Sequence, residues 1–124
     1  MRRVTTSAAQ AAAFYREAVR EQSVWTIRDE AGYPAPLTAS GHRAQPFWSL
    51  RSRVERTQSR IADYAPFTPE EIALDAFRAK WLSNLERDGI LVGLNWSGTH
   101  ATGYDLTGAE VERNLAATRL MSPR

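Results

Sequence analysis

The spacing of apolar residues changes several times along the chain, and each change predicts a new element. From Ser7 to about Gln22, apolar side chains recur every three or four positions, which is typical of a helix with one buried face. Ser7 and Gln10 also have the spacing of a capping box. The predicted buried face is Ala11, Phe14, Ala18 and Val19, and the predicted solvent face is Arg16, Glu17, Arg20 and Glu21.

Alternation with a period of two predicts strands elsewhere. In the first strand, Trp25 and Ile27 fall on one side, while Val24 and Thr26 fall on the other. Ile90–Trp96 is apolar on both faces and is therefore expected to be central in the sheet. The strands expected on this basis are Ser23–Asp29, a short edge strand around Tyr33–Leu37, Ala44–Trp48, Ile90–Trp96 and Thr102–Leu106.

Three further helices follow from the pattern and from capping signals. The second begins at a capping box, Ser52–Glu55, and runs to about Asp63 with Leu50, Val54 and Ile61 inward. The third runs from Asp75 through Phe77, Trp81, Leu82 and Leu85 to a C-cap at Asp88–Gly89. The fourth begins at a capping box, Thr107–Glu110, and buries Val111, Leu115 and Leu120.

The segment from Thr68 to Leu74 fits two structures. Thr68-Pro69-Glu70-Glu71 resembles a helix start with proline in the first turn, whereas Glu71–Leu74 fits a short strand with Asp75 capping the next helix. The order of elements predicts one α+β domain over residues 1–124, with an ordered core at about 7–119. We expect a mainly antiparallel sheet of about five or six strands with about four helices.

Composition narrows the functional classes. The 124 residues are enough for one core, and the 43% apolar and 24% charged content is that of a globular domain. There are no cysteines, so disulfides and thiolate chemistry are excluded. No apolar stretch approaches the roughly 18 residues of a membrane span, and no signal-peptide pattern follows Met1. A cytoplasmic protein without membrane association is expected.

The basic residues form one notable cluster. All but one of the 16 basic residues are arginine, and Arg53, Arg56 and Arg60 share one helix face, with Arg51 beside them. One interpretation is a solvated face paired with Glu55 and Asp63. The other is contact with an anion or an acidic partner, helped by free N–H groups near Ser49 and Ser52 at the helix start. A net charge of +2 argues against nucleic acid as the main partner.

A second candidate surface combines tryptophans with polar residues at strand ends. If these strands are neighbours, the side chains converge at one end of the sheet, either as core and turn caps or as a recognition patch. In the second case, a ring edge of Trp48 or Trp96 is expected to be accessible. The members of this patch are Trp25, Arg28, Asp29, Trp48, Ser49, Asn95, Trp96 and Tyr104.

Sites for catalysis, metals or cofactors are not predicted. Ser97, His100 and Asp105 contain the residue types of a triad, but they crowd one hairpin without a nucleophile elbow. His42 and His100 lack metal-ligand spacing, and the glycines do not form a phosphate-binding loop. We therefore expect no catalytic residue, no metal and no cofactor.

Five blocks of the chain carry a family resemblance. They are Phe14-Tyr15-Arg16-Glu17, Val24-Trp25-Thr26-Ile27-Arg28-Asp29, Gly32-Tyr33-Pro34-Ala35-Pro36, Pro46-Phe47-Trp48-Ser49 and Asp88-Gly89-Ile90-Leu91-Val92-Gly93-Leu94-Asn95-Trp96. With these blocks the chain resembles a family of short bacterial proteins, domain of unknown function 2750, over about residues 8–115. The resemblance implies no activity, so it assigns no catalytic residue. In that family a proline often precedes the equivalent of Leu74, which favours the short strand there, although this chain has Ala73.

Three functional hypotheses remain. The leading one is a small protein-binding module, of an immunity, inhibitor or regulatory type, with an unidentified protein partner. The second is a small-ligand binder or enzyme that uses the Trp/Asn/Asp patch. The third is an anion-binding or nucleic-acid-binding adaptor that uses the Arg53, Arg56 and Arg60 face. A deep pocket with convergent polar groups favours the second, and an exposed aromatic patch favours the first. The oligomeric state is left open.

Overall fold

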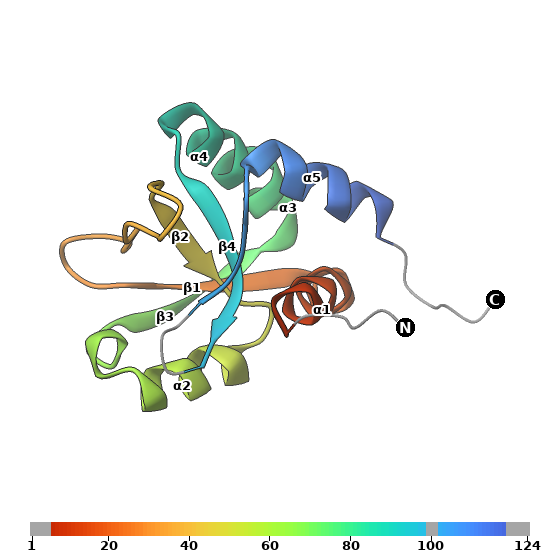
Figure 1. Ribbon diagram of the computed structural model, residues 1–124. Coiled ribbons are helices and arrows are strands. Elements are labelled where there is room, and N and C mark those ends of the chain that lie inside the picture. The colour runs from red at the N-terminus through yellow and green to blue at the C-terminus, as the bar shows by residue number, and fades with distance from the viewer. Residues whose placement is uncertain (1–5, 99–101, 119–124) are drawn as a thin grey trace, which may run out of the picture.

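The predicted helices and strands are formed in the predicted order, except for the edge strand expected around Tyr33–Leu37. The computed structural model describes residues 6–98 and 102–118. Within them the chain is an α+β domain, which confirms the predicted fold class (Figure 1). The elements are α1 (Thr6–Glu21), β1 (Ser23–Arg28), β2 (Ala44–Phe47), α2 (Arg51–Arg60), η1 (Ala62–Tyr64), β3 (Thr68–Ala73), α3 (Leu74–Ala76), η2 (Phe77–Trp81), α4 (Leu82–Asp88), β4 (Leu91–Ser97), β5 (Thr102–Leu106) and α5 (Gly108–Ala117).

The described strands form two small sheets rather than one. Strand β4 is central in the larger sheet, parallel to β2 and antiparallel to β5, and β1 pairs antiparallel with β3 in the other. One bridge joins the sheets, because Trp25 and Trp48 exchange two backbone N–H···O bonds of 2.7 Å. The short edge strand predicted around Tyr33–Leu37 does not form. Pro34 and Pro36 lack N–H donors there, and the segment makes only isolated bridges.

Helices cover the two sides of this strand layer unequally. In Figure 1, α1, α4 and α5 lie to the right of and above β4, and α2 lies below it. Two clusters of buried apolar residues result. The large core is Ala11, Phe14, Ala18, Val24, Phe47, Ile72, Leu74, Phe77, Leu82, Leu85, Val92, Leu94, Val111 and Leu115, and the small core, beside α2, is Ile27, Ala44, Trp48, Val54 and Trp96.

The observed helix ends agree best with the prediction where a cap depends on residues a few positions apart. The Thr107–Glu110 capping box is formed at the start of α5, and Gly89 ends α4 in the left-handed conformation with φ +71°. The capping box predicted at Ser52–Glu55 is wrong. The N-cap of α2 is Leu50, two residues before Ser52, and makes no side-chain bond, and the helix ends at Arg60 rather than Asp63. Glu55 accepts a bond from Arg51 instead.

The ambiguous segment is a strand. Residues Thr68–Ala73 pair along the whole of β1, with Pro69 opposite Ile27 at the edge of the sheet, where its missing N–H is tolerated. The next helix begins at Leu74 with Ala73 as its N-cap, so the prediction that Asp75 caps it is wrong. The predicted Ser7 cap and the buried position of Leu120 lie outside the described side chains.

Phe77 and Trp81 lie on the same apolar stripe but differ in burial. Phe77 is fully buried, whereas Trp81 is partly exposed between the rings of Phe47 and Tyr33. We expect Phe77→Ala to lower the free energy of unfolding by about 3–5 kcal/mol, because it opens a cavity in the large core. Trp81→Ala is expected to cost less, since part of its surface already faces water. Urea denaturation of both variants checks this order, and a larger loss for Trp81→Ala would contradict it.

Candidate functional site

A bulge in β4 organises the polar residues at the centre of the molecule. Leu94 pairs with Tyr104 and Ser97 with Thr102, so three steps along β4 match two along β5. Asn95 lies at this extra residue with φ +52°, in the left-handed region that asparagine adopts more readily than most residues. A bulge of this kind redirects the side chains that follow it.

The bulge places Asn95 and Trp96 on the opposite faces of β4 from those they would occupy in a regular strand. In a regular strand, Leu94 and Trp96 would share a face, yet Leu94 lies in the large core and Trp96 in the small core. The Trp96 ring covers Gly93, where an added Cβ would lie 2.4 Å from the ring. The Asn95 side chain therefore faces α1, and its Nδ2 donates to the carbonyl of Gln10 over 3.2 Å.

The Asn95 amide also holds the chain between β2 and α2. Its Oδ1 accepts the backbone N–H of Ser49 over 2.9 Å, and its Nδ2 donates to Ser49 Oγ over 3.0 Å. Asn95 and Ser49 are 1% and 0% exposed. Since a buried donor without a partner costs about 1–3 kcal/mol, these bonds fix the start of α2 against β4. The N–H of Ser49 is thus not free for an anion.

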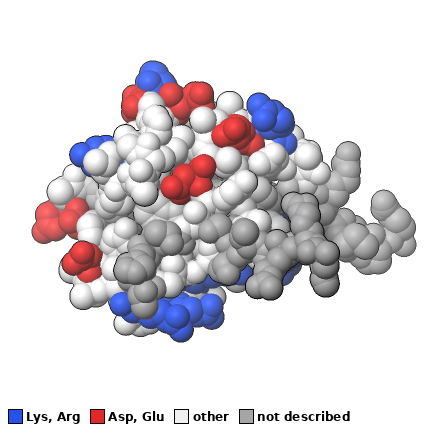
Figure 2. Space-filling view, viewed as in Figure 1, with Lys and Arg blue, Asp and Glu red and all other residues white. Residues whose placement is uncertain are grey.

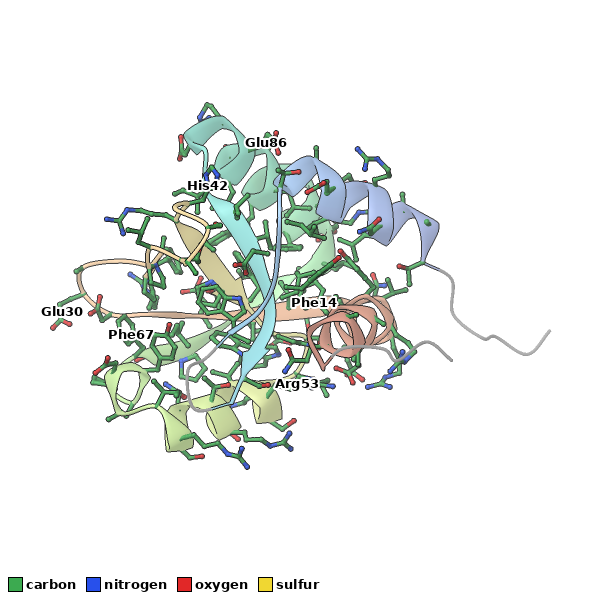
Figure 3. All side chains as sticks on the ribbon, in the orientation of Figure 1. Phe14, Glu30, His42, Arg53, Phe67 and Glu86 are labelled. Atoms are coloured by element: carbon green, nitrogen blue, oxygen red, sulfur yellow. The ribbon has the colours of Figure 1, made fainter. Side chains whose placement is uncertain are left out.

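A buried carboxylate continues the network. Ser49 Oγ donates to Glu17 Oε1 over 2.6 Å, and Arg53 donates to both Glu17 oxygens over 2.8 and 2.7 Å. Figure 3 places Arg53 between α1 and α2. The prediction that Glu17 faces solvent is wrong, because it is 9% exposed. Burial alone would raise the pKa of Glu17, but the bonds from Arg53 and Ser49 outweigh it and hold the pKa below its ordinary value.

Two of the tryptophans are internal. Trp48 and Trp96 are 1% and 3% exposed, so the expectation of an accessible ring edge is wrong. Trp48 Nε1 donates to the carbonyl of Trp96 over 2.8 Å, and Trp96 Nε1 donates to Asp105 Oδ1 over 2.7 Å. Burial raises the pKa of Asp105, and the bond from Trp96 lowers it by less. Both indole groups are therefore used to hold the small core together.

The other members of the predicted patch lie nearer the surface. Trp25 is partly exposed, and the guanidinium of Arg51 lies 5.4 Å from its ring centre. Arg28 is exposed, contacts Glu70 over 3.6 Å and lies 5.6 Å from the ring centre of Tyr33. The eight predicted residues thus divide: Trp48, Ser49, Asn95 and Trp96 are buried, Trp25 and Asp29 are partly exposed, and Arg28 and Tyr104 are exposed.

The segment of residues 29–43 is a surface that the sequence interpretation missed. It carries Leu37, which is 64% exposed, and Tyr33, which is 36% exposed. Figure 3 shows Glu30 at its outer end and His42 where it returns toward β4. The signal available in the sequence was its length without a convincing period, which is typical of functional loops.

Ser97 and Asp105, the two described members of the triad that the sequence offered, are each bonded to another group. Ser97 Oγ accepts a bond from the Gln10 amide, and Asp105 accepts the Trp96 indole N–H. His100 lies outside the described residues. Within residues 6–98 and 102–118, no group of three or more His, Cys, Asp or Glu residues is arranged to hold a metal ion. Over the same residues, no helix combines the length and apolar character needed to cross a membrane.

A comparison with models of protein families shows to which family this chain belongs. The model of the family described as "Protein of unknown function (DUF2750)" matches residues 11–115. The chain belongs to this family. No curated protein and no solved structure matches the chain. Membership confirms the resemblance drawn from the sequence, and it assigns no activity to any residue of this family member.

The bulge at Asn95 generates a stability prediction. Asn95→Ala removes the side-chain bonds and leaves an alanine in the left-handed region, and we expect it to lower the free energy of unfolding by about 2–4 kcal/mol. Asn95→Gly removes the same bonds but tolerates the backbone conformation, so its loss should be smaller by about 1 kcal/mol. Denaturant unfolding measures both. Equal losses would show that β4 abandons the bulge when the amide is absent.

The Glu17 cluster predicts a specific pH dependence. Since the folded-state pKa of Glu17 is lowered, its ionised form stabilises the protein above the ordinary glutamate pKa of about 4.3. This stabilisation is lost as the pH falls through the folded-state pKa. Glu17→Gln should destabilise the protein at pH 7, and the difference from wild type should shrink in acid.

The matched control for Glu17→Gln is Glu55→Gln, which removes an exposed carboxylate paired with Arg51. That change should have little effect on stability at either pH, because exposed ion pairs contribute little. The measurement is thermal or urea unfolding of wild type and both variants between pH 7 and pH 3. A Glu17→Gln difference that stays constant over this range would contradict the assigned pKa direction.

Proposed function

We propose that this protein is a binding module that recognises a protein partner through the segment of residues 29–43. The observation that carries the proposal is the exposure of Leu37, 64%, on a loop whose backbone is hydrogen-bonded to itself. Loops longer than roughly 12–15 residues without secondary structure are usually functional. An exposed apolar side chain on such a loop is suited to insert into an apolar pocket of a partner protein.

Internal bonds support a preformed loop. The N–H of Thr38 donates to the carbonyl of His42 over 2.8 Å, and the N–H of Gly41 donates to the carbonyl of Thr38 over 3.0 Å. The Arg43 guanidinium donates to the carbonyl of Ala35 over 3.0 Å. A loop that is ordered before binding loses less conformational entropy in the complex, which favours affinity.

The base of the loop is attached to the domain through Tyr33. Its hydroxyl donates to Glu70 over 2.8 Å, and its ring packs edge-on against Trp81 at a centroid distance of 4.9 Å. Arg28 lies on the same ring. These contacts place charged groups beside the exposed ring of Tyr33, and an apolar or aromatic contact with a polar rim is typical of protein interfaces. Of the residues in the sequence hypothesis, Asp29 lies in this segment and Arg28 contacts Tyr33.

The alternative, a small-ligand binder or enzyme that uses the Trp/Asn/Asp patch, has less support. Asn95, Trp48 and Trp96 are almost wholly buried, and their side-chain polar atoms are bonded to backbone groups or to the side chains of Ser49 and Asp105. An open cavity of about 600 Å3 lies elsewhere, between α1, α3 and α5, and none of the patch residues lines it. The patch is therefore better suited to hold strands and α2 in place than to admit a ligand.

The proposal predicts a separation between binding and stability at Leu37. The immobilised wild-type protein is used to isolate a partner from the native host, and the partner is then titrated against purified variants. Leu37→Asp should leave the free energy of unfolding within about 0.5 kcal/mol of wild type, since the side chain is exposed, and should abolish partner binding.

Tyr104→Ser is the matched control, because Tyr104 is also a large exposed side chain, at 45%, but lies on β5. It should retain partner binding. Loss of binding in Tyr104→Ser together with full binding in Leu37→Asp would overturn the assignment to the loop and place the contact at β5.

A further inference from the structure

The arginines of α2 are not equivalent. Arg51 pairs with Glu55 over 2.9 Å, and Arg53 pairs with Glu17 over 2.7 Å. Arg56 and Arg60 form no ion pair with any residue of the described part of the chain. Of the four arginines that the sequence grouped as one anion-binding face, two are therefore neutralised by carboxylates and two keep an uncompensated positive charge.

The two unpaired arginines line one cavity. It has a volume of about 300 Å3 and lies between the C-terminal half of α2 and the end of β4. Figure 2 shows Lys and Arg side chains gathered at the bottom of the molecule, where Figure 1 places α2. Among the described residues, the cavity is lined by Arg56, Thr57, Arg60, Ser97 and Gly98, none of which is acidic.

Of the two hydroxyl groups opposite the arginines, that of Ser97 keeps a proton for a ligand, and that of Thr57 donates to the backbone. Ser97 Oγ accepts a bond from the Gln10 amide, so its own proton is directed to another acceptor. Thr57 is buried, and its hydroxyl donates to the carbonyl of Trp96 over 3.1 Å, which fixes this wall of the cavity. The cavity thus combines two guanidinium groups with a hydroxyl donor on a rigid wall.

We propose that this cavity binds a phosphate group carried by a small molecule or present as free phosphate. Two guanidinium groups supply paired N–H donors that match the oxygens of a phosphate, and a phosphate ester carries a charge of about −1.5 to −2 at pH 7. The site stands apart from the 29–43 loop, so it is independent of the proposed protein contact. Arg56 and Arg60 bind the phosphate oxygens, and Ser97 donates a further hydrogen bond.

A purely structural role makes a different prediction for Arg60. It lies in the last turn of α2, where a positive charge interacts favourably with the C-terminal end of the helix dipole. In that case, Arg60→Gln would lower the melting temperature in phosphate-free buffer, and the wild type would show no saturable phosphate binding. The two roles are thus separable by measuring stability and binding on the same variants.

The experiment is isothermal titration calorimetry of the full chain with inorganic phosphate and, separately, with glucose 6-phosphate, at pH 7.5 and low salt. We expect one saturable site, weakened by roughly tenfold or more in Arg56→Gln/Arg60→Gln because both charge-assisted contacts are lost. The control is Arg16→Gln/Arg51→Gln, which removes the same charge from exposed positions outside the cavity and should bind like wild type. Circular dichroism and thermal unfolding verify that both variants are folded.

The two ligands distinguish the source of the phosphate. Tighter binding of glucose 6-phosphate assigns the site to an organic phosphate ester, and tighter binding of inorganic phosphate assigns it to the free anion. The proposal is overturned if neither ligand binds saturably, or if both double variants lose affinity equally. Binding of duplex DNA that disappears with salt, without binding of either small ligand, would also overturn it in favour of diffuse attraction to α2.

Discussion

The left-handed conformation of Asn95 is the constraint on which the arrangement of this protein depends. One extra residue in β4 exchanges the faces of Asn95 and Trp96, so that a polar amide is directed toward α1 and an indole enters the small core. Without the bulge, Trp96 would lie on the side of Leu94 and Asn95 beside Gly93. The large core would then have to accept an indole, and the small core would lose its central ring.

The bulge also explains why the buried polar groups form one network. Asn95 bonds to Ser49, Ser49 bonds to Glu17, and Glu17 bonds to Arg53. This chain of contacts links β4, the start of α2 and the middle of α1. A buried carboxylate is tolerated only when its charge is balanced and its oxygens are bonded. The same network therefore fixes the position of α2, neutralises the charge of Arg53 and engages the N–H of Ser49.

The two surfaces proposed for binding present side chains that lie outside the network of Asn95, Ser49, Glu17 and Arg53. The 29–43 loop presents Leu37 and Tyr33 on one part of the molecule, and Arg56 and Arg60 border a cavity on another. The first surface supports the proposed protein contact, and the second supports the proposed phosphate site. Leu37, Arg56 and Arg60 carry exposed groups outside the buried network, whereas Tyr33 also attaches its loop to Glu70 and Trp81.

Local patterns in the sequence determined the order and type of most elements, the capping box of α5 and the left-handed cap at Gly89, but left Thr68–Leu74 open and wrongly predicted a strand at Tyr33–Leu37. These features depend on side-chain period and on bonds between residues a few positions apart, which sequence records directly. Only the tertiary structure decided that Glu17 is buried, that Asn95 redirects Trp96, and that Arg53 differs from Arg56. The partner that neutralises Arg53 is 36 positions away. The Arg51–Glu55 pair follows from helical spacing, but the Arg53–Glu17 pair depends on the packing of α2 against α1, which the local sequence does not record.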